Sequence, residues 1–202
     1  MSDDHWGEYA RATRGGPPRP LLLEVLAHLD ANLPPGRALD LGSGAGNDSL
    51  ELLRRGWLVT ALDRNAEAPD GLRAQAGDLA GRLTTVQGSF QAAPRRRYRL
   101  VYASLSLPFC PPENFGRTLR GVVARVGVGG WFAATLFDVR DGWAERADMT
   151  FVTPQDLGAR LEGLSVEVLR EEESTVRLAL GGEHHSHLLT VIARRPTYGP
   201  SV

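Results

Sequence analysis

Residues 38–48 have the sequence ALDLGSGAGND, and a second apolar run, LVTALD, follows at residues 58–63. An apolar run, a glycine-rich turn and a leucine-containing segment at residues 47–55 predict a strand, a sharp turn and a crossover helix. Asp63 falls at the carboxyl end of the second strand. A nucleotide-binding α/β unit places a carboxylate there to hold ribose hydroxyls. This order of elements predicts a parallel α/β sheet with a nucleotide-type site at the turn.

The glycine spacing indicates which nucleotide to expect. A dinucleotide fingerprint, Gly-x-Gly-x-x-Gly, needs a third glycine for close helix–strand packing, and Asn47 stands at that position. Instead Gly42, Gly44 and Gly46 recur at every second residue, with Asp40 two residues before the first of them. An acid here would repel a pyrophosphate and attract a cation. S-adenosylmethionine, which carries a sulfonium and an ammonium, fits this pattern; the alternative is a turn that binds no cofactor.

The composition is that of an ordinary globular protein. The chain has 202 residues, a formal net charge of −1 and one cysteine, Cys110. A near-neutral chain argues against a large nucleic-acid footprint, which usually gives a basic domain. The single cysteine excludes an internal disulfide framework and fits a reducing compartment. The polar N-terminus is no signal peptide, and no segment is apolar enough to span a bilayer. We expect a cytoplasmic protein with neither membrane nor nucleic-acid partners.

A helical segment precedes the sheet. Trp6 and Tyr9 are three residues apart and would share one face of a helix, and residues 19–33 have apolar side chains at helical spacing. The aromatic pair either anchors the first helix on the core or belongs to a lid. We divide the chain into a helical cap at residues 1–36, the main domain at residues 37–196 and a tail at residues 197–202.

The remaining apolar runs complete the predicted sheet. A helix is expected from Pro111 to Val126, ended by the glycines of residues 127–130. Thr153 and Pro154 predict a capped helix start. The expected strands are at residues 82–87, 100–105 and 131–137, and three strand-like runs follow at residues 164–172, 175–180 and 188–193.

Three of the five histidines lie in residues 181–187, GGEHHSH. A metal site is one interpretation, but no cysteine stands at ligand spacing, and we assign no metal. A general base or oxyanion binder is the second interpretation, and an exposed hairpin loop is the third. His187, which enters the following strand, is the candidate catalytic residue.

The runs GAGNDS (residues 44–49) and GWLVTALD (residues 56–63) resemble class I S-adenosylmethionine-dependent methyltransferases. The likeness extends from about Tyr9 to Ala193 and is greatest to the small-molecule type near the tellurite- and thiopurine-resistance branch. It implies an α/β fold with a Rossmann-like seven-stranded sheet. That sheet would be mostly parallel, with an antiparallel edge strand and helices on both faces.

The resemblance also implies roles for individual residues. The glycine turn would cradle the methionine part of the cofactor, and Asp63 would hold the ribose. At the third strand's end the family usually has an acid that contacts adenine, and here Ser89 replaces it while Phe90 keeps the apolar part. Ser104 and Leu105 would shape the reaction centre. The candidate cofactor-binding residues are Tyr9 and Arg14 as lid residues, with Asp40, Gly42, Ser43, Gly44, Gly46, Asp63, Arg64, Ser89, Phe90, Ser104 and Leu105.

The function that these residues imply is direct in-line methyl transfer from S-adenosylmethionine to a small-molecule acceptor. A soft nucleophile such as sulfur needs no base, whereas a hydroxyl or protonated amine needs one. Residues 106–109, SLPF, partly resemble the motif of amino-group methyltransferases of nucleic acids, but Leu107 replaces its first proline. Two other classes stay open: a non-catalytic cofactor-binding domain and an NAD(P)-dependent oxidoreductase. We expect a monomer or a homodimer.

Overall fold

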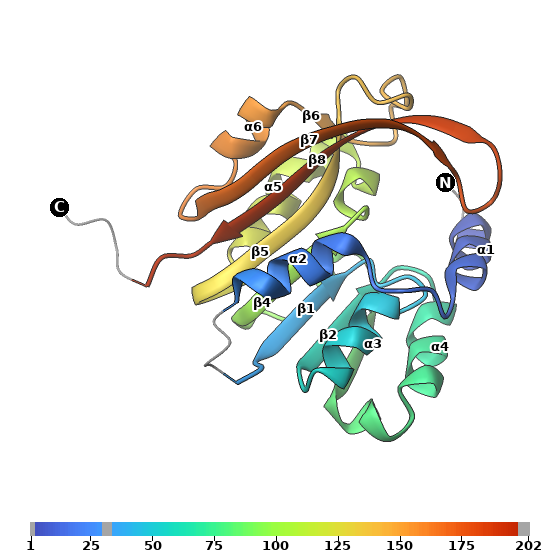
Figure 1. Ribbon diagram of the computed structural model, residues 1–202, viewed down its shortest axis with the longest axis vertical. Coiled ribbons are helices and arrows are strands. Elements are labelled where there is room, and N and C mark those ends of the chain that lie inside the picture. The colour runs from blue at the N-terminus through green and yellow to red at the C-terminus, as the bar shows by residue number, and fades with distance from the viewer. Residues whose placement is uncertain (1–2, 30–33, 198–202) are drawn as a thin grey trace.

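The computed structural model describes residues 3–29 and 34–197 (Figure 1). No helix in this part of the chain is long and apolar enough to cross a membrane. In chain order the elements are α1 (Asp3–Thr13), α2 (Pro20–His28), β1 (Arg37–Leu41), α3 (Asn47–Arg54), β2 (Leu58–Asp63), α4 (Glu67–Ala76), η1 (Gly77–Arg82), β3 (Leu83–Gln87), η2 (Phe90–Ala92), β4 (Tyr98–Ser104), η3 (Leu107–Phe109), α5 (Pro112–Val123), β5 (Val126–Asp138), β6 (Phe151–Val152), α6 (Pro154–Ala159), β7 (Ser165–Arg177) and β8 (Glu183–Arg194).

The strands form one sheet in the order β3-β2-β1-β4-β5-β8-β7, and the short β6 pairs with β5. β3, β2, β1, β4 and β5 are parallel to one another. β8 runs antiparallel to both β5 and β7. The prediction of a mostly parallel Rossmann-like sheet with an antiparallel edge is confirmed, with β6 as an unpredicted eighth strand. The strand order reverses between β1 and β4, and ligands bind at such a switch point.

Helices cover both faces of the sheet, as predicted (Figure 1). Side chains alternate along β4, so Leu100 and Tyr102 join the core beneath α2, α3 and α4. Val101 and Ala103 point the other way and join the core beneath α5 and α6. This period of two follows from the pleat of a strand. Because α2 contributes Leu22 to the first core, this part of the expected helical cap packs directly on the sheet.

Several predicted boundaries are wrong because long-range pairing extends the strands. β5 begins at Val126, since the glycines expected to precede it continue the strand through a register shift against β4. The three C-terminal runs are two long strands, β7 and β8, which pair from Ser165–Arg194 to Arg177–Glu183 with one register shift between Val166 and Val168. The helix expected at residues 19–33 ends at His28, where the chain becomes extended; residues 30–33 lie outside the described residues.

The β7–β8 ribbon projects beyond the carboxyl edge of the sheet (Figure 1). β8 pairs with β5 only from Leu188 onward, whereas residues 183–187 pair only with β7. The turn of the ribbon therefore lies at residues 178–182, and the histidines lie within β8. This result corrects the expectation of a histidine loop.

Candidate functional site

The glycine turn connects the carboxyl end of β1 to α3. Gly42, Gly44 and Gly46 all have positive φ, at 75°, 52° and 88°. A Cβ on Gly42 would lie 2.4 Å from the Cβ of Ser106, and one on Gly46 would lie 2.4 Å from Cδ1 of Leu72. A Cβ on Gly44 would meet nothing within 4 Å. Packing inside the protein therefore explains two of the glycines, whereas a Cβ on Gly44 would point into open space.

Asp63 holds the turn in place from the end of β2. One carboxylate oxygen accepts the backbone N–H of Gly44 at 2.8 Å, and the other accepts that of Asn65 at 2.8 Å. Each oxygen has a second lone pair, and the side chain is partly exposed. The carboxylate can therefore fix the turn and accept ribose hydroxyls at the same time.

Asp40 lies beneath the turn rather than on its surface. It is 3% exposed, and its Oδ2 accepts the hydroxyl of Ser49 at 2.6 Å. Burial, with the nearby charge of Asp48, raises the pKa of Asp40 to about 7. Its action on a cationic ligand would be electrostatic and through the turn, without direct contact in this conformation.

Asp48 is a buried acid at the start of α3 that the sequence analysis did not single out. It accepts the backbone N–H of Arg19 at 2.7 Å and the hydroxyl of Tyr102 at 3.1 Å. Burial raises its pKa. The signal in the sequence is an acid in the first turn of a helix, where the dipole favours it. Asp48 thus ties the segment before α2 to the site.

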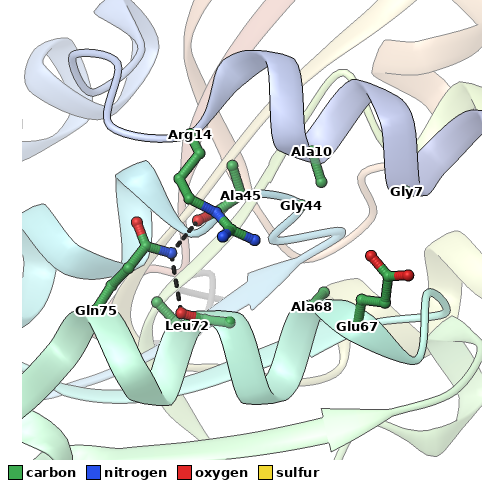
Figure 2. A pocket seen from close by; sticks show the side chains of 10 residues that line it. Gly7, Ala10, Arg14, Gly44, Ala45, Glu67, Ala68, Leu72 and Gln75 are labelled. Atoms are coloured by element: carbon green, nitrogen blue, oxygen red, sulfur yellow. Dashed lines mark hydrogen bonds between the residues drawn. The ribbon is translucent and has the colours of Figure 1, made fainter.

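The N-terminal helix covers the open side of the turn (Figure 2). Gly7 and Ala10 of α1 and Arg14, which follows this helix, line a pocket together with Gly44 and with Gln75 of α4. The Arg14 side chain points into the space between the two helices (Figure 2). α1 and Arg14 therefore lie over the glycine turn, and their role as a lid stays a prediction.

The other predicted lid residue, Tyr9, lies outside this pocket, and its hydroxyl accepts a hydrogen bond from Arg19 at 2.7 Å. Two further bonds fasten the end of α1 to the start of α3. The Asn47 amide donates to the carbonyl of Thr13 at 2.8 Å and accepts the N–H of Gly15 at 3.2 Å. Both contacts hold α1 close to the glycine turn.

The remaining cofactor candidates lie at the carboxyl ends of β2, β3 and β4. Arg64 lines a second pocket with Gln87, next to the first. Ser89 is exposed, whereas Phe90 is partly buried against the core. Ser104 ends β4, and Leu105, which follows it, has a φ of 50°.

A left-handed leucine is strained, and such residues cluster at functional sites. Leu105 is the one non-glycine residue with positive φ among those described. The next residue, Ser106, donates its hydroxyl to the carbonyl of Leu41 at 2.6 Å and so joins the ends of β1 and β4. Ser43 occupies the turn between Gly42 and Gly44, with its backbone N–H bonded to Leu62 at 3.0 Å.

His187 lies apart from these residues, because β4 and β5 separate β8 from the glycine turn. It is 4% exposed, and its Nε2 lies 3.3 Å from Oε2 of Glu171. Asp138, Glu171 and His187 offer ligand atoms within 4.8 Å of one another. Arg140 forms ion pairs with both carboxylates and so supplies a positive charge there. The catalytic role of His187 stays a prediction.

The other histidines also differ from an exposed hairpin loop. His184 is 7% exposed, and its Nε2 lies 3.0 Å from Oδ1 of Asp141. His185, by contrast, has an exposed side chain. The expectation of an exposed loop is therefore wrong for two of the three, because β7 pairing and the residue 139–150 loop cover them.

Comparison with known proteins agrees with this geometry. Residues 38–130 match the family model described as "Methyltransferase domain". The matched residues include the glycine turn, Asp63 and β4. No curated protein matches the chain in sequence.

Solved structures show the same fold. TehB from Haemophilus influenzae has a TM-score of 0.73 and 18% identity, covering 86% of this chain; this chain spans 61% of that protein. The Burkholderia thailandensis 1,6-didemethyltoxoflavin-N1-methyltransferase, with its substrate and S-adenosylhomocysteine bound, has a TM-score of 0.67 and 24% identity over 96% of this chain and 81% of that one. The [4+2]-cyclase SpnF has a TM-score of 0.73 and 14% identity over 97% and 95%. The fold expected from the resemblance is confirmed.

The raised pKa of Asp40 predicts how pH affects stability. Between about pH 4 and pH 7 the unfolded chain loses the proton that the folded chain keeps, so stability falls as pH rises. At about 1.4 kcal/mol for one pKa unit, the loss over roughly three units is on the order of 4 kcal/mol. Asp40→Asn should remove this loss. The free energy of unfolding in urea should therefore rise for the variant, relative to that of the wild type, from pH 5 to pH 8. Parallel profiles would contradict the assignment; Asp70→Asn, in an exposed position, is the control.

Because a Cβ on Gly44 would meet no other atom within 4 Å, we expect a substitution there to lower cofactor affinity more than it lowers stability. Gly44→Ala should cost only the left-handed strain of about 1–2 kcal/mol in urea unfolding, while calorimetry shows S-adenosylmethionine affinity reduced about tenfold or more. Gly46→Ala, which adds a clash with Leu72, should destabilise the protein further. Unchanged cofactor affinity in Gly44→Ala would show that the ligand does not lie against this turn.

Proposed function

We propose that the protein is an S-adenosylmethionine-dependent methyltransferase that acts on a small-molecule acceptor. The observation that carries the proposal is the glycine turn held by Asp63 with open space at Gly44, within the residues that match a methyltransferase domain. The Burkholderia structure with bound S-adenosylhomocysteine supports this cofactor. We also propose a cytoplasmic location, on the single cysteine, and a monomer or homodimer.

When bound, the cofactor supplies a methyl group already activated by its sulfonium. The residues of this chain would then mainly bind, orient and exclude water. Gly42, Ser43, Gly44 and Gly46 would hold the methionine part, with the charge of Asp40 beneath them. Asp63 would bind the ribose hydroxyls, and Arg64, Ser89 and Phe90 would surround the adenine base. Ser104 and Leu105 would lie at the reaction centre. Tyr9 and Arg14 would belong to the N-terminal segment that covers the cofactor.

His187 would be the base for an acceptor that must lose a proton. It is buried behind the residue 139–150 loop, so this role requires that loop to move. An acceptor with a soft nucleophile needs no such step.

The central test is turnover of the purified protein with S-adenosylmethionine and a panel of small thiols, chalcogen oxyanions, amines and phenols, followed as S-adenosylhomocysteine formation. Asp63→Ala should lower cofactor affinity about 10- to 100-fold, because it removes hydrogen bonds to a charged group worth about 1.5–3 kcal/mol. Asp70→Ala, whose side chain is 87% exposed, should bind like the wild type.

Unchanged affinity in Asp63→Ala would overturn the ribose assignment. Cofactor binding without turnover on any acceptor would favour the cofactor-binding domain instead.

A further inference from the structure

Five aromatic side chains meet at the carboxyl ends of β4 and β5. Trp6 of α1 contacts Phe109 of η3 at 4.5 Å between ring centroids, and Phe109 contacts Phe137 of β5 at 6.0 Å. Phe137 also contacts Trp143 at 5.6 Å and Phe151 at 6.2 Å. Phe137 is 4% exposed, and the other four are partly exposed. We call these five residues the aromatic wall.

The aromatic wall begins beside the proposed reaction centre. Phe109 closes the short helix that follows the strained Leu105 and Ser106. Trp6 immediately precedes Gly7, which lines the pocket at the glycine turn. One helix, α1, therefore carries residues that face the turn and a residue that faces the wall. A molecule held against the wall would lie next to the carboxyl end of β4, where the methyl group must be delivered.

A buried polar network holds Trp143 in place. Its indole stacks on the His184 ring at 4.0 Å with 27° between the planes. Asp141, 3% exposed, lies 3.0 Å from that histidine and accepts the backbone N–H of Trp143 at 2.9 Å. Its other oxygen accepts the N–H of His187 at 2.9 Å. His184 of β8 thus orients an aromatic ring, which is a use that the sequence alone did not indicate.

The two arginines of the loop that carries Trp143 are paired with acids. Arg140 binds Asp138 and Glu171, and Arg146 binds Asp148. Among the described residues, the cation–π contacts that involve tryptophan are Arg99 with Trp57 and Arg194 with Trp131, away from the wall. The wall therefore offers π faces and ring edges rather than a cation for an oxyanion. Such edges and faces favour another aromatic ring.

We propose that the methyl acceptor is a flat aromatic or heteroaromatic molecule, bound against the aromatic wall with Trp6 closing over it. This inference rests on the proposed function. In the reaction a lone pair on the acceptor forms the bond to the methyl carbon. The carbon–sulfur bond breaks with its electron pair kept by sulfur, and any proton on the acceptor atom passes to His187, the base in the proposed function. His184 is a positioning residue, because it acts through Trp143.

The test compares 2-naphthol with decahydro-2-naphthol, which share a carbon skeleton and one hydroxyl but differ in aromaticity. Calorimetric titration into protein saturated with S-adenosylhomocysteine should give roughly tenfold tighter binding of 2-naphthol. Trp143→Leu and Phe109→Leu should reduce this preference to about twofold or less while S-adenosylhomocysteine affinity stays unchanged. His184→Ala should do the same, whereas His185→Ala, next to it on the exposed side, should not.

Equal affinity for the two probes, no binding of either, or a preference that survives in Trp143→Leu would overturn the proposal. Methylation of chalcogen oxyanions by a protein without aromatic preference would also place the acceptor elsewhere. The affinity for S-adenosylhomocysteine distinguishes a failure of the aromatic acceptor from a failure of the proposed function. A protein that binds it but lacks the preference refutes only the aromatic acceptor, and a protein that does not bind it refutes the proposed function.

Discussion

The hydrogen bond from the Gly44 N–H to the Asp63 carboxylate is the contact on which the site depends. It joins residues nineteen apart, at the ends of β1 and β2. The N–H groups of Gly42 and Ser43 add bonds of 2.7 and 3.0 Å to the carbonyl of Leu62. The turn is therefore held by the neighbouring strand and needs no ligand to keep its shape. Preorganisation of this kind lowers the entropy lost when a ligand binds.

Beneath the turn, the protein keeps two acids away from water. Asp40 has Ser49 as its partner, and Asp48 has Arg19 and Tyr102. Buried carboxyl groups disfavour their charged form, so the unliganded fold carries a cost that a hydrophobic core would avoid. A cationic ligand above the turn would relieve part of that cost. The same network fixes the covering segment, which connects electrostatics at the turn to the position of α1.

The sequence predicted the parts of the structure that depend on nearby residues. Strand, glycine turn, helix and Asp63 occur within residues 37–63, where local spacing determines the geometry. It could not predict the β7–β8 ribbon, because the pairing of His184 with Val176 is set by tertiary contacts rather than by propensity. The aromatic wall was missed for the same reason, since Trp6 and Phe109 come together only after folding. Asp48 was missed because its partners are also distant in sequence.

The most direct measurement is calorimetric titration of the purified protein with S-adenosylmethionine, S-adenosylhomocysteine and NADPH under one set of conditions. The geometry of the turn predicts binding of both sulfur compounds at one site per chain and no heat from NADPH. The open space at Gly44, the buried Asp40 and the missing third glycine all lead to this result. Binding of NADPH alone would contradict the account, because it would show that the turn holds a pyrophosphate above Asp40.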